Sequence, residues 1–503
     1  MNFVDNFLNK ITMYKLVLYS LQILTAFSIL CGFLGFLPFS GFHLIFSALV
    51  ITIVCYGTNY VLAKLFQVTT NVESSSITSY ILFLILAPIA TFSDLWTVVT
   101  ICIVAMASKY IIAIHKKHIF NPAAIALVVI GLFGSGVAIW WVATPIMLPL
   151  VLICGLLIVK KVCRFELFFT FIFSSILSIF AFSFLRGAGF SLVEVLTAWP
   201  ILYFGTIMLT EPTTTPPQKS MQIIYGALVG GLFGLSFHFG PLYSSPELAL
   251  ILGNLFVYIV SPKIKLNLIL KEKNQLVPDV YEFVFLSDKK ISFEAGQYLE
   301  WTFGHTPSDN RGNRRYFTIA SSPTESDIRL GLKFYSSPST FKKSLLSLAV
   351  GGKIGASQLA GDFILPKDKT KKLVWIAGGI GITPFRSQTK FLLDTGDKRD
   401  IVLLYANKNG TSIAYKDFLD SSSVAVGMRN VYVVNDLQDT DSSSDLKAGS
   451  IDEKMIISEV PDYRERYFYI SGPHAMVSAF ENILKKMGIH NDHIKVDFFP
   501  GFV

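Results

Sequence analysis

Hydrophobic and polar positions divide the chain into two parts with different patterns. Before Ser261, long apolar runs alternate with short polar connections, whereas the second part has short alternating segments. A membrane span needs about 20 apolar residues to cross ~30 Å of hydrocarbon. Apolar runs of this kind begin near ten positions: Leu16, Phe42, Ile77, Leu95, Pro122, Ile146, Phe165, Ser191, Met221 and Pro246. The pattern predicts a polytopic α-helical membrane domain of about ten spans.

The basic residues orient these predicted spans. With the N-terminus inside, only Arg186 falls on the outer side. Twelve basic residues fall on the inner side: Lys10, Lys15, Lys64, Lys109, Lys116, Lys117, Lys160, Lys161, Arg164, Lys219, Lys263 and Lys265. This positive-inside pattern predicts a multi-pass protein of a bacterial inner (plasma) membrane with both termini cytoplasmic. The run from Ile77 is short and contains Pro88, so we expect a broken helix there.

The second part predicts two further domains. Five alternating segments predict an antiparallel β-barrel: Leu268–Leu270, Val280–Leu286, Tyr298–Phe303, Tyr316–Ala320 and Ile328–Phe334. Beyond Pro366, the strand Lys372–Ala377, a helix around Phe385–Asp394 and the strand Ile401–Tyr405 predict a parallel α/β unit. The expected domains are 1–262 for the membrane part, 263–366 for the barrel and 367–503 for the α/β part.

Composition narrows the class of protein. The chain is 52% hydrophobic and 16% charged, and up to Ser261 it has only seven acidic and eleven basic residues. The net charge of +8 does not indicate nucleic-acid binding, because the basic residues of the first part lie at the ends of apolar segments. All five cysteines lie in the first part as single residues, a pattern untypical of disulfide, zinc or iron–sulfur sites. We expect neither a metal nor a nucleic-acid partner.

One predicted barrel strand carries candidate flavin chemistry. Arg315 offers a cation for a flavin phosphate, Phe317 a flat ring against the isoalloxazine, and Thr318 a hydroxyl near flavin N5, where hydride arrives. Downstream, Lys333 ends another strand, and the Ser339-Thr340 turn could hold a pyrophosphate through its N–H and hydroxyl groups.

A glycine-rich turn follows the first strand of the α/β unit. Glycines at such a turn let the backbone approach a phosphate, and a helix N-terminus adds a favourable dipole. The turn and the helix start supply these residues: Gly378, Gly379, Gly381, Thr383 and Pro384. The sequence Ser471-Gly472-Pro473 ends a later strand and is expected beside the nicotinamide.

Together these motifs resemble the ferredoxin–NADP⁺ reductase-like superfamily over residues 265–503. The resemblance implies non-covalent FAD, hydride transfer from NAD(P)H to its N5, and catalytic roles for Thr318 and Phe317. Gly361 matches the turn of that family, and Phe498 or Phe499 would cover the flavin ring. Lys408 is a single cation after the strand that ends at Tyr405, which favours NADH slightly over NADPH.

The first part resembles another group, the D subunit of Rnf complexes and the B subunit of the sodium-pumping NADH:quinone reductase. The matching pieces occur in the order of that family: Ile77–Leu82 with Ala87-Pro88, Phe120–Ala124 and Met208–Pro216. Those subunits carry FMN on a threonine of an S-G-A-T sequence. This chain has no S-G-A-T, so covalent FMN is not expected at the usual place.

These features predict a membrane-bound NAD(P)H oxidoreductase that passes electrons through FAD to a flavin, quinone or other carrier in or across the membrane. A hypothetical landing site for the electrons comprises Glu73, Ser74–Ser76, Glu211 and Thr213–Thr215, with solvated loops as the alternative. Haem is not expected, since the sequence places no histidine pair inside the membrane. The alternative hypothesis is a transporter or channel that is regulated by a nucleotide-binding domain. Ion coupling, the acceptor and association of chain copies stay open.

Overall fold

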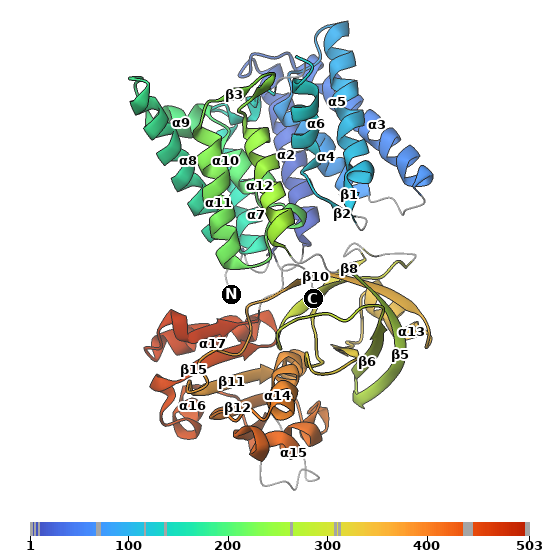
Figure 1. Ribbon diagram of the computed structural model, residues 1–503, viewed down its shortest axis with the longest axis vertical. Coiled ribbons are helices and arrows are strands. Elements are labelled where there is room, and N and C mark those ends of the chain that lie inside the picture. Colours follow the sequence, from blue (N-terminus) through green and yellow to red (C-terminus); the bar gives the residue numbers. More distant parts are fainter. Residues whose placement is uncertain are drawn as a thin grey trace. The chain divides into compact units, whose positions relative to one another are not determined.

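The computed structural model describes residues 4, 7–8, 11–66, 72–114, 117–134, 138–261, 265–305, 309, 313–435 and 446–497. The chain divides between Ser261 and Pro262 into two compact units (Figure 1). The N-terminal unit is helical, whereas the C-terminal unit contains two six-stranded sheets.

In the N-terminal unit, a helix begins within a few residues of each predicted apolar run. The helices are α2 (Met13–Phe33), α3 (Gly41–Leu65), α4 (Val72–Ile85), α5 (Phe92–Ile111), α6 (Pro122–Gly131), α7 (Leu148–Val162), α8 (Phe165–Leu185), α9 (Leu192–Ala198), α10 (Ile201–Tyr203), α11 (Lys219–Gly234) and α12 (Pro246–Val260). Two short hairpins, β1 (Ala113–Ile114) with β2 (Lys117–His118) and β3 (His238–Phe239) with β4 (Leu242–Tyr243), complete the unit. Among the described residues, four helices are long and apolar enough to cross a membrane: α2, α3, α5 and α8.

The expectation of about ten full-length spans is therefore not met by helix length, and backbone breaks shorten two of the predicted runs. Helix α4 ends at Ile85, and a non-helical segment follows through Pro88, as the predicted break requires. The run from Ser191 divides at Trp199-Pro200 into α9, α10 and a π-helical turn. Proline lacks a backbone N–H and disfavours helical geometry in the residue before it. An apolar run thus locates a helical segment without fixing its length.

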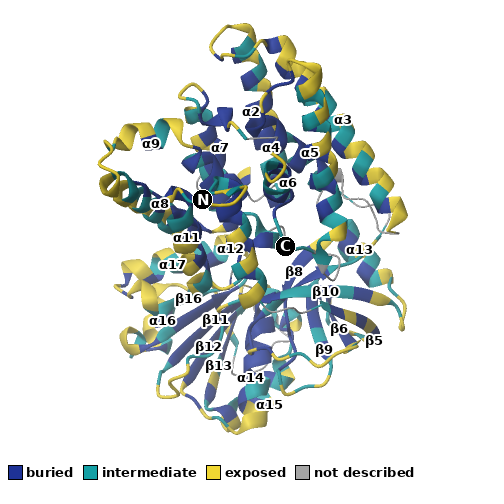
Figure 2. Ribbon diagram, turned by 45° about the horizontal axis from the view of Figure 1, so that its top comes forward, coloured by how far each residue is buried: buried dark blue, intermediate teal, exposed yellow. Residues whose placement is uncertain are grey.

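Large apolar side chains cover the outer surface of the N-terminal unit. On α3, Phe42 is 74% exposed and Ile53 is 68% exposed, and on α8 Phe173 is 69% exposed. Figure 2 shows such exposed positions repeating along α3. Large apolar side chains exposed along several helices are typical of a face that contacts lipid or another apolar partner.

Helices α8 and α11 approach closely through small residues. The Ser174 Oγ donates to the carbonyl of Gly226 (3.2 Å), and the Ser178 Oγ donates to that of Gly230 (3.0 Å). A Cβ added at Gly230 would lie 2.0 Å from the Ser174 Oγ, whereas one at Gly231 would meet nothing within 4 Å. Small residues allow this close packing in membrane helices, where association depends on van der Waals contact.

The C-terminal unit begins with a curled antiparallel sheet, as predicted. Its strands are β5 (Lys265–Val277), β6 (Val280–Ser287), β7 (Tyr298–Thr302), β8 (Arg314–Thr318), β9 (Ile328–Lys333) and β10 (Lys353–Ala360), in the spatial order β8-β7-β10-β5-β6-β9. Helix α13 (Thr340–Ser347) lies between β9 and β10 in the chain. Strand β10 was not among the predicted segments. Apolar side chains of alternate positions, such as Leu268 and Trp301, fill the interior.

The second sheet is parallel where its pairs are described, in the order β14-β13-β12-β11-β15-β16. Its strands are β11 (Leu373–Gly378), β12 (Ile401–Asn407), β13 (Met428–Val434), β14 (Leu446–Ala448), β15 (Tyr467–Ser471) and β16 (Ile494–Val496). Its helices are α14 (Thr383–Thr395), α15 (Lys416–Val426), α16 (Glu453–Glu459) and α17 (His474–Lys486). Figure 2 shows the central strands buried, which suits their continuous apolar runs.

Charged side chains join the barrel to the nucleotide-binding sheet. Arg386 on α14 pairs with Glu325 (Nη2–Oε1 3.0 Å), and Glu325 also pairs with Arg329 on β9 (3.2 Å). Arg329 pairs in turn with Glu282 on β6 (2.6 Å), whose other oxygen accepts from the Tyr415 hydroxyl (3.0 Å). Because ions in such a network are partly desolvated and geometrically specific, it fixes the position of α14 against the barrel.

Candidate functional site

The predicted flavin strand is β8, which pairs with β7 in the barrel. Arg315, Phe317 and Thr318 are all buried, with exposed fractions of 3%, 5% and 5%. Arg315 and Phe317 share one face of the strand and both contact the Phe341 ring of α13, at 5.4 and 6.0 Å between group centres. Thr318 alternates to the opposite face and reaches the nucleotide-binding sheet. The strand therefore presents a cation and a hydroxyl to two different neighbours.

Helix α13 places its N-terminus next to Arg315. The Ser339 Oγ caps the helix by accepting from the Lys342 N–H (3.3 Å). The N–H of Thr340 donates to the Asp309 Oδ2 at 2.9 Å, and the Asp309 Oδ1 lies 3.8 Å from the Arg315 Nη2. A carboxylate is thus held by a cation and a helix N-terminus, the two groups that attract phosphates in proteins.

This donor set fits the diphosphate predicted from the sequence. Asp309 acts as a stand-in anion, because one carboxylate oxygen takes the helix N–H and the other faces the guanidinium. Arg315, Ser339 and Thr340, three of the residues predicted to bind FAD, come together here. Asp309 was not identified from the sequence, although an acidic residue shortly before the strand that carries Arg315 could have indicated a partner for this cation.

The glycine-rich turn lies at the carboxyl end of β11. A Cβ at Gly381 would lie 2.3 Å from the Ser471 carbonyl, and one at Gly378 would lie 2.3 Å from the Met476 Sδ. Gly379 has a φ of +52°, and its carbonyl accepts from the buried Tyr405 hydroxyl at 3.0 Å. Gly381 packs directly against the end of β15, where a phosphate and a nicotinamide are expected, and Gly379 is favoured by its positive φ.

Helix α14 follows this turn directly. Pro384 occupies its first turn, where a missing N–H costs nothing, and the Thr383 Oγ1 donates to the Ile380 carbonyl at 3.2 Å. The helix therefore begins where the sequence predicted.

A buried carboxylate joins the two predicted halves of the site. The Asp497 Oδ2 accepts from the Ser471 Oγ at 3.0 Å and from the Thr318 Oγ1 at 3.5 Å. Burial raises the pKa of Asp497 to about 7, although both hydroxyl hydrogen bonds oppose the rise and the nearby Asp362 adds to it. Thr318 and Ser471, predicted for the flavin and the nicotinamide, thus meet through a residue that the sequence did not identify. The feature of the sequence that could have indicated Asp497 is an acidic residue within an apolar segment.

Other predicted residues lie near these groups with different roles. The Lys333 carbonyl accepts from the Lys342 Nζ at 3.0 Å, which attaches β9 to α13. Gly361 has a φ of +115° and accepts from the Gln297 side chain at 3.2 Å, so it forms a turn between the two sheets. Gly472 and Pro473 connect β15 to α17, beside Gly378. Phe499 and Phe498 lie outside the described residues.

The N-terminal unit holds a second polar cluster, centred on Glu211. One carboxylate oxygen lies 3.2 Å from the His118 Nε2 and accepts from the Thr213 hydroxyl at 2.9 Å. The other accepts from the Asn121 side chain at 2.9 Å, and the Asn121 N–H donates to the Asn254 side chain at 2.9 Å. The Glu211 side chain is 23% exposed. A solvated loop, the alternative considered for this segment, does not describe it.

A small cavity joins the three family-like pieces of the N-terminal unit. Its volume is ≈ 60 Å³, and its walls include Thr78, Asn121 and Glu211, one from each piece, together with Lys109. The Lys109 ammonium donates to the Ser74 carbonyl at 2.8 Å. Ligand pockets usually measure about 300–1,000 Å³. As the side chains lie, the cavity has room for water-sized groups.

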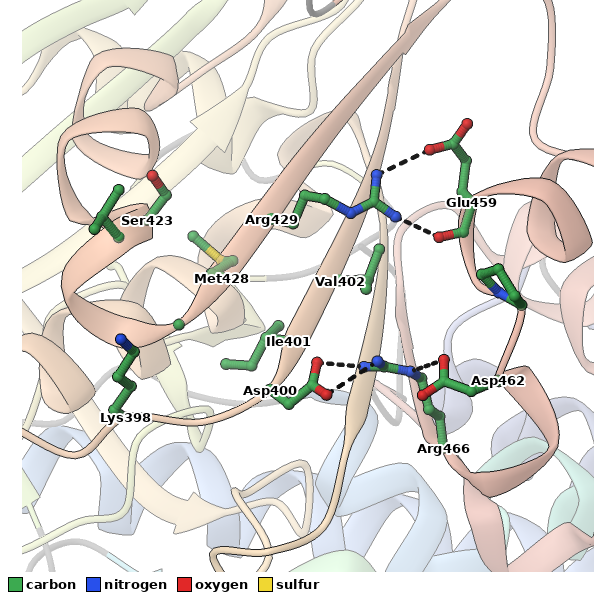
Figure 3. Close-up of a pocket in the computed structure, with 13 residues that line it drawn as sticks. Lys398, Asp400, Ile401, Val402, Ser423, Met428, Arg429, Glu459, Asp462 and Arg466 are labelled. Atoms are coloured by element: carbon green, nitrogen blue, oxygen red, sulfur yellow. Dashed lines mark hydrogen bonds and ion pairs between the residues drawn. The ribbon is translucent and has the colours of Figure 1, made fainter.

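A larger cleft of ≈ 450 Å³ lies at the other edge of the parallel sheet (Figure 3). Its lining includes Ile401 and Met428, the first residues of β12 and β13, so it opens at the amino ends of the strands. Arg429 pairs with Glu459, and Arg466 pairs with Asp400 and Asp462. Because these guanidinium groups are already matched by carboxylates, the cleft offers less to a charged ligand than the opposite edge.

Comparison with known proteins addresses the C-terminal unit. Residues 375–482 match the family of oxidoreductase NAD-binding domains. The flavohemoprotein of Bacillus cereus is 27% identical over 219 residues, covering 42% of this chain and 54% of that protein. The reductase subunit of a glycine betaine monooxygenase from Chromohalobacter salexigens is 25% identical over 228 residues, or 44% and 60% of the two chains. The chain spans about half the length of the curated relatives it matches.

Among solved structures, the cytochrome b5 reductase domain of Ulva prolifera nitrate reductase is similar over 47% of this chain and 98% of that one, with a TM-score of 0.41 and 22% identity. The sequence matches confirm a ferredoxin reductase-like oxidoreductase domain that uses FAD and NAD(P)H. The resemblance of the N-terminal unit to the Rnf and sodium-pumping subunits stays a prediction.

Proposed function

We propose that the chain is a membrane-bound NAD(P)H oxidoreductase that passes electrons through FAD to an acceptor in or across the membrane. The observation that carries the proposal is the buried junction in which Asp497 links Thr318 to Ser471. It joins the strand proposed for the flavin to the strand end proposed for the nicotinamide, and hydride transfer requires those two rings to lie face to face.

Each group of residues has a separate task in this proposal. FAD, when bound, supplies the chemistry of accepting a hydride and releasing electrons singly. Arg315 and the α13 N-terminus would hold its diphosphate, and Thr318 and Phe317 on the same strand would serve the flavin ring. The turn around Gly381 holds the diphosphate of the nicotinamide nucleotide. These roles follow from charge, helix dipole and close backbone approach.

Asp497 sets the charge beside the hydride-transfer position. Its pKa of about 7 leaves it largely neutral in weak acid and ionised in weak base. A neutral carboxyl accommodates the negative charge that a flavin gains with the hydride, whereas a carboxylate opposes it. Ser471 and Thr318 keep this group fixed in either state.

The membrane role rests on the N-terminal unit. We propose domains at 1–262, 263–366 and 367–503. From the apolar helices and the distribution of basic residues, we propose that the first domain has about ten membrane-embedded segments and that both termini are cytoplasmic. The Glu211 cluster is proposed as part of the electron path to a membrane carrier. The alternative, a transporter or channel regulated by nucleotide, predicts nucleotide binding without oxidation.

Purified full-length chain in detergent tests the proposal. Acid denaturation should release FAD, with about one flavin per chain, and the native sample should oxidise NADH faster than NADPH with an artificial dye as acceptor. Nucleotide binding without dye reduction would favour the hypothesis of a regulated transporter or channel. Flavin that stays attached after acid would reveal a covalent site, for which Thr213–Thr215 are the first residues to substitute.

A further inference from the structure

Asp309 uses the same donors as the proposed FAD diphosphate. Its Oδ2 accepts from the Thr340 N–H at 2.9 Å, and its own N–H donates to the Thr340 Oγ1 at 2.9 Å. Its Oδ1 faces the Arg315 guanidinium at 3.8 Å, and the Arg315 side chain is only 2% exposed. Both anion-attracting features of this part of the barrel are therefore engaged by one carboxylate.

A second side chain reinforces the arrangement. The His305 Nε2 lies 2.9 Å from the Thr340 Oγ1, and the His305 Nδ1 lies 3.0 Å from the Phe303 carbonyl. The Thr340 hydroxyl thus has the Asp309 N–H and the His305 ring as neighbours. An incoming phosphate cannot use the Thr340 N–H or approach the buried guanidinium closely while the carboxylate remains, because two anions would share one small positive site.

We propose that Asp309 is an internal competitor of the FAD diphosphate, so that its carboxylate must leave Thr340 and Arg315 before the cofactor binds. This inference rests on the proposed function, since it concerns the same flavin site. The carboxylate compensates the Arg315 charge and accepts from the first N–H of α13 until the cofactor displaces it. The cofactor then binds at the expense of those contacts, which lowers its affinity and slows its association.

The test is FAD binding to full-length chain in detergent after removal of its flavin. In the D309N variant the amide oxygen still accepts from the Thr340 N–H, so α13 stays capped while the charge is lost. We expect the Kd for FAD, measured by flavin fluorescence quenching, to fall about three- to tenfold, since an anion at a helix N-terminus and a cation contributes on this scale. Stopped-flow mixing should show faster association and unchanged dissociation.

The matched control is D288N, which neutralises an exposed aspartate of the same barrel that bonds to Asn267. It should bind FAD as the wild type does. Equal FAD binding by D309N would overturn the proposal, and weaker binding would overturn it and make Asp309 part of the loaded site. The D309S variant, whose hydroxyl also caps helices, decides the matter if D309N does not fold. Wild-type protein that takes up no FAD would instead refute the proposed function.

Discussion

The two units hold their polar side chains in different ways. In the C-terminal unit, the predicted residues lie at strand ends and helix starts, where Asp309 and Asp497 link them in pairs. In the N-terminal unit, Glu211 and its partners satisfy one another between helix ends, around a cavity of ≈ 60 Å³. Polar groups bond to one another in both units, so the C-terminal residues are distinguished by their place at strand ends and helix N-termini, where backbone groups can hold a phosphate. Buried polar groups in a helical bundle must first bond to each other.

Two assays distinguish the contributions of the units. Dye reduction measures the activity of the C-terminal unit, and reduction of a short-chain quinone measures electron transfer through both units. The largest effect is expected from Arg315→Ala. Loss of a charge-assisted bond to phosphate should weaken FAD binding by roughly 10- to 100-fold and lower both activities. Flavin content after purification and titration with FAD measure it. Arg314→Ala, on the exposed side of the same strand, is the control, and equal flavin loss in both variants would contradict the assignment.

The next effect concerns the nucleotide turn. In Gly381→Ala the new Cβ would lie 2.3 Å from the Ser471 carbonyl, so the strand ends must separate. Overpacking of this kind costs about 1–3 kcal/mol, and we expect NAD(P)H oxidation to fall about tenfold in both assays. Gly379→Ala faces open space and strains only its φ of +52°, so its loss should be smaller. Steady-state kinetics with a fixed dye concentration rank the two variants; the reverse ranking would refute the close-packing explanation.

Glu211→Gln tests the N-terminal unit alone. The change removes the carboxylate that bonds to Asn121 and faces His118, and we expect quinone reduction to fall by up to about tenfold while dye reduction is unchanged. Glu166→Gln, at a site that is 51% exposed beside Lys219, should affect neither assay. Unchanged quinone reduction in Glu211→Gln would remove this cluster from the proposed electron path.

Asp497→Asn should give the smallest change in rate and a clear change in pH dependence. In the wild type, flavin reduction should slow as pH rises through about 7, where the buried carboxyl ionises; the variant should lack this decline. Because the native pKa lies above the unfolded value, the contribution of this group to the free energy of unfolding should fall between about pH 4 and pH 7. Stopped-flow reduction and denaturant unfolding across pH 5–9 measure both, and parallel profiles would contradict the role.

Sequence alone located most of the C-terminal fold. Alternation and glycine turns depend on local residues, so β6, β9 and β11 were found within a few residues of their ends. Strand β10 was missed because Gly355 and polar neighbours interrupt its pattern. Asp497 was missed because its meaning depends on Thr318, 179 positions away in the chain.

In the N-terminal unit the apolar runs predicted where the helices begin, but they did not predict how long the helices are. Hydrophobicity measures transfer into lipid, whereas the ends of α4 and α9 depend on backbone breaks such as that at Pro200. The contacts of Glu211 with His118 and Asn121 join residues about 90 apart, and no local pattern encodes such pairing.

The close packing of helices α8 and α11 has an evolutionary consequence. Gly226, Gly230 and Gly234 each face atoms that a methyl group would strike, whereas Gly231 on the same helix is open. Natural variants of this protein can therefore drift at Gly231 while selection holds its neighbour Gly230. A lineage with a larger residue at Gly230 or Gly234 would have to separate α8 from α11, because the new Cβ would strike the backbone of Phe171 or Ile179 as well as a serine hydroxyl.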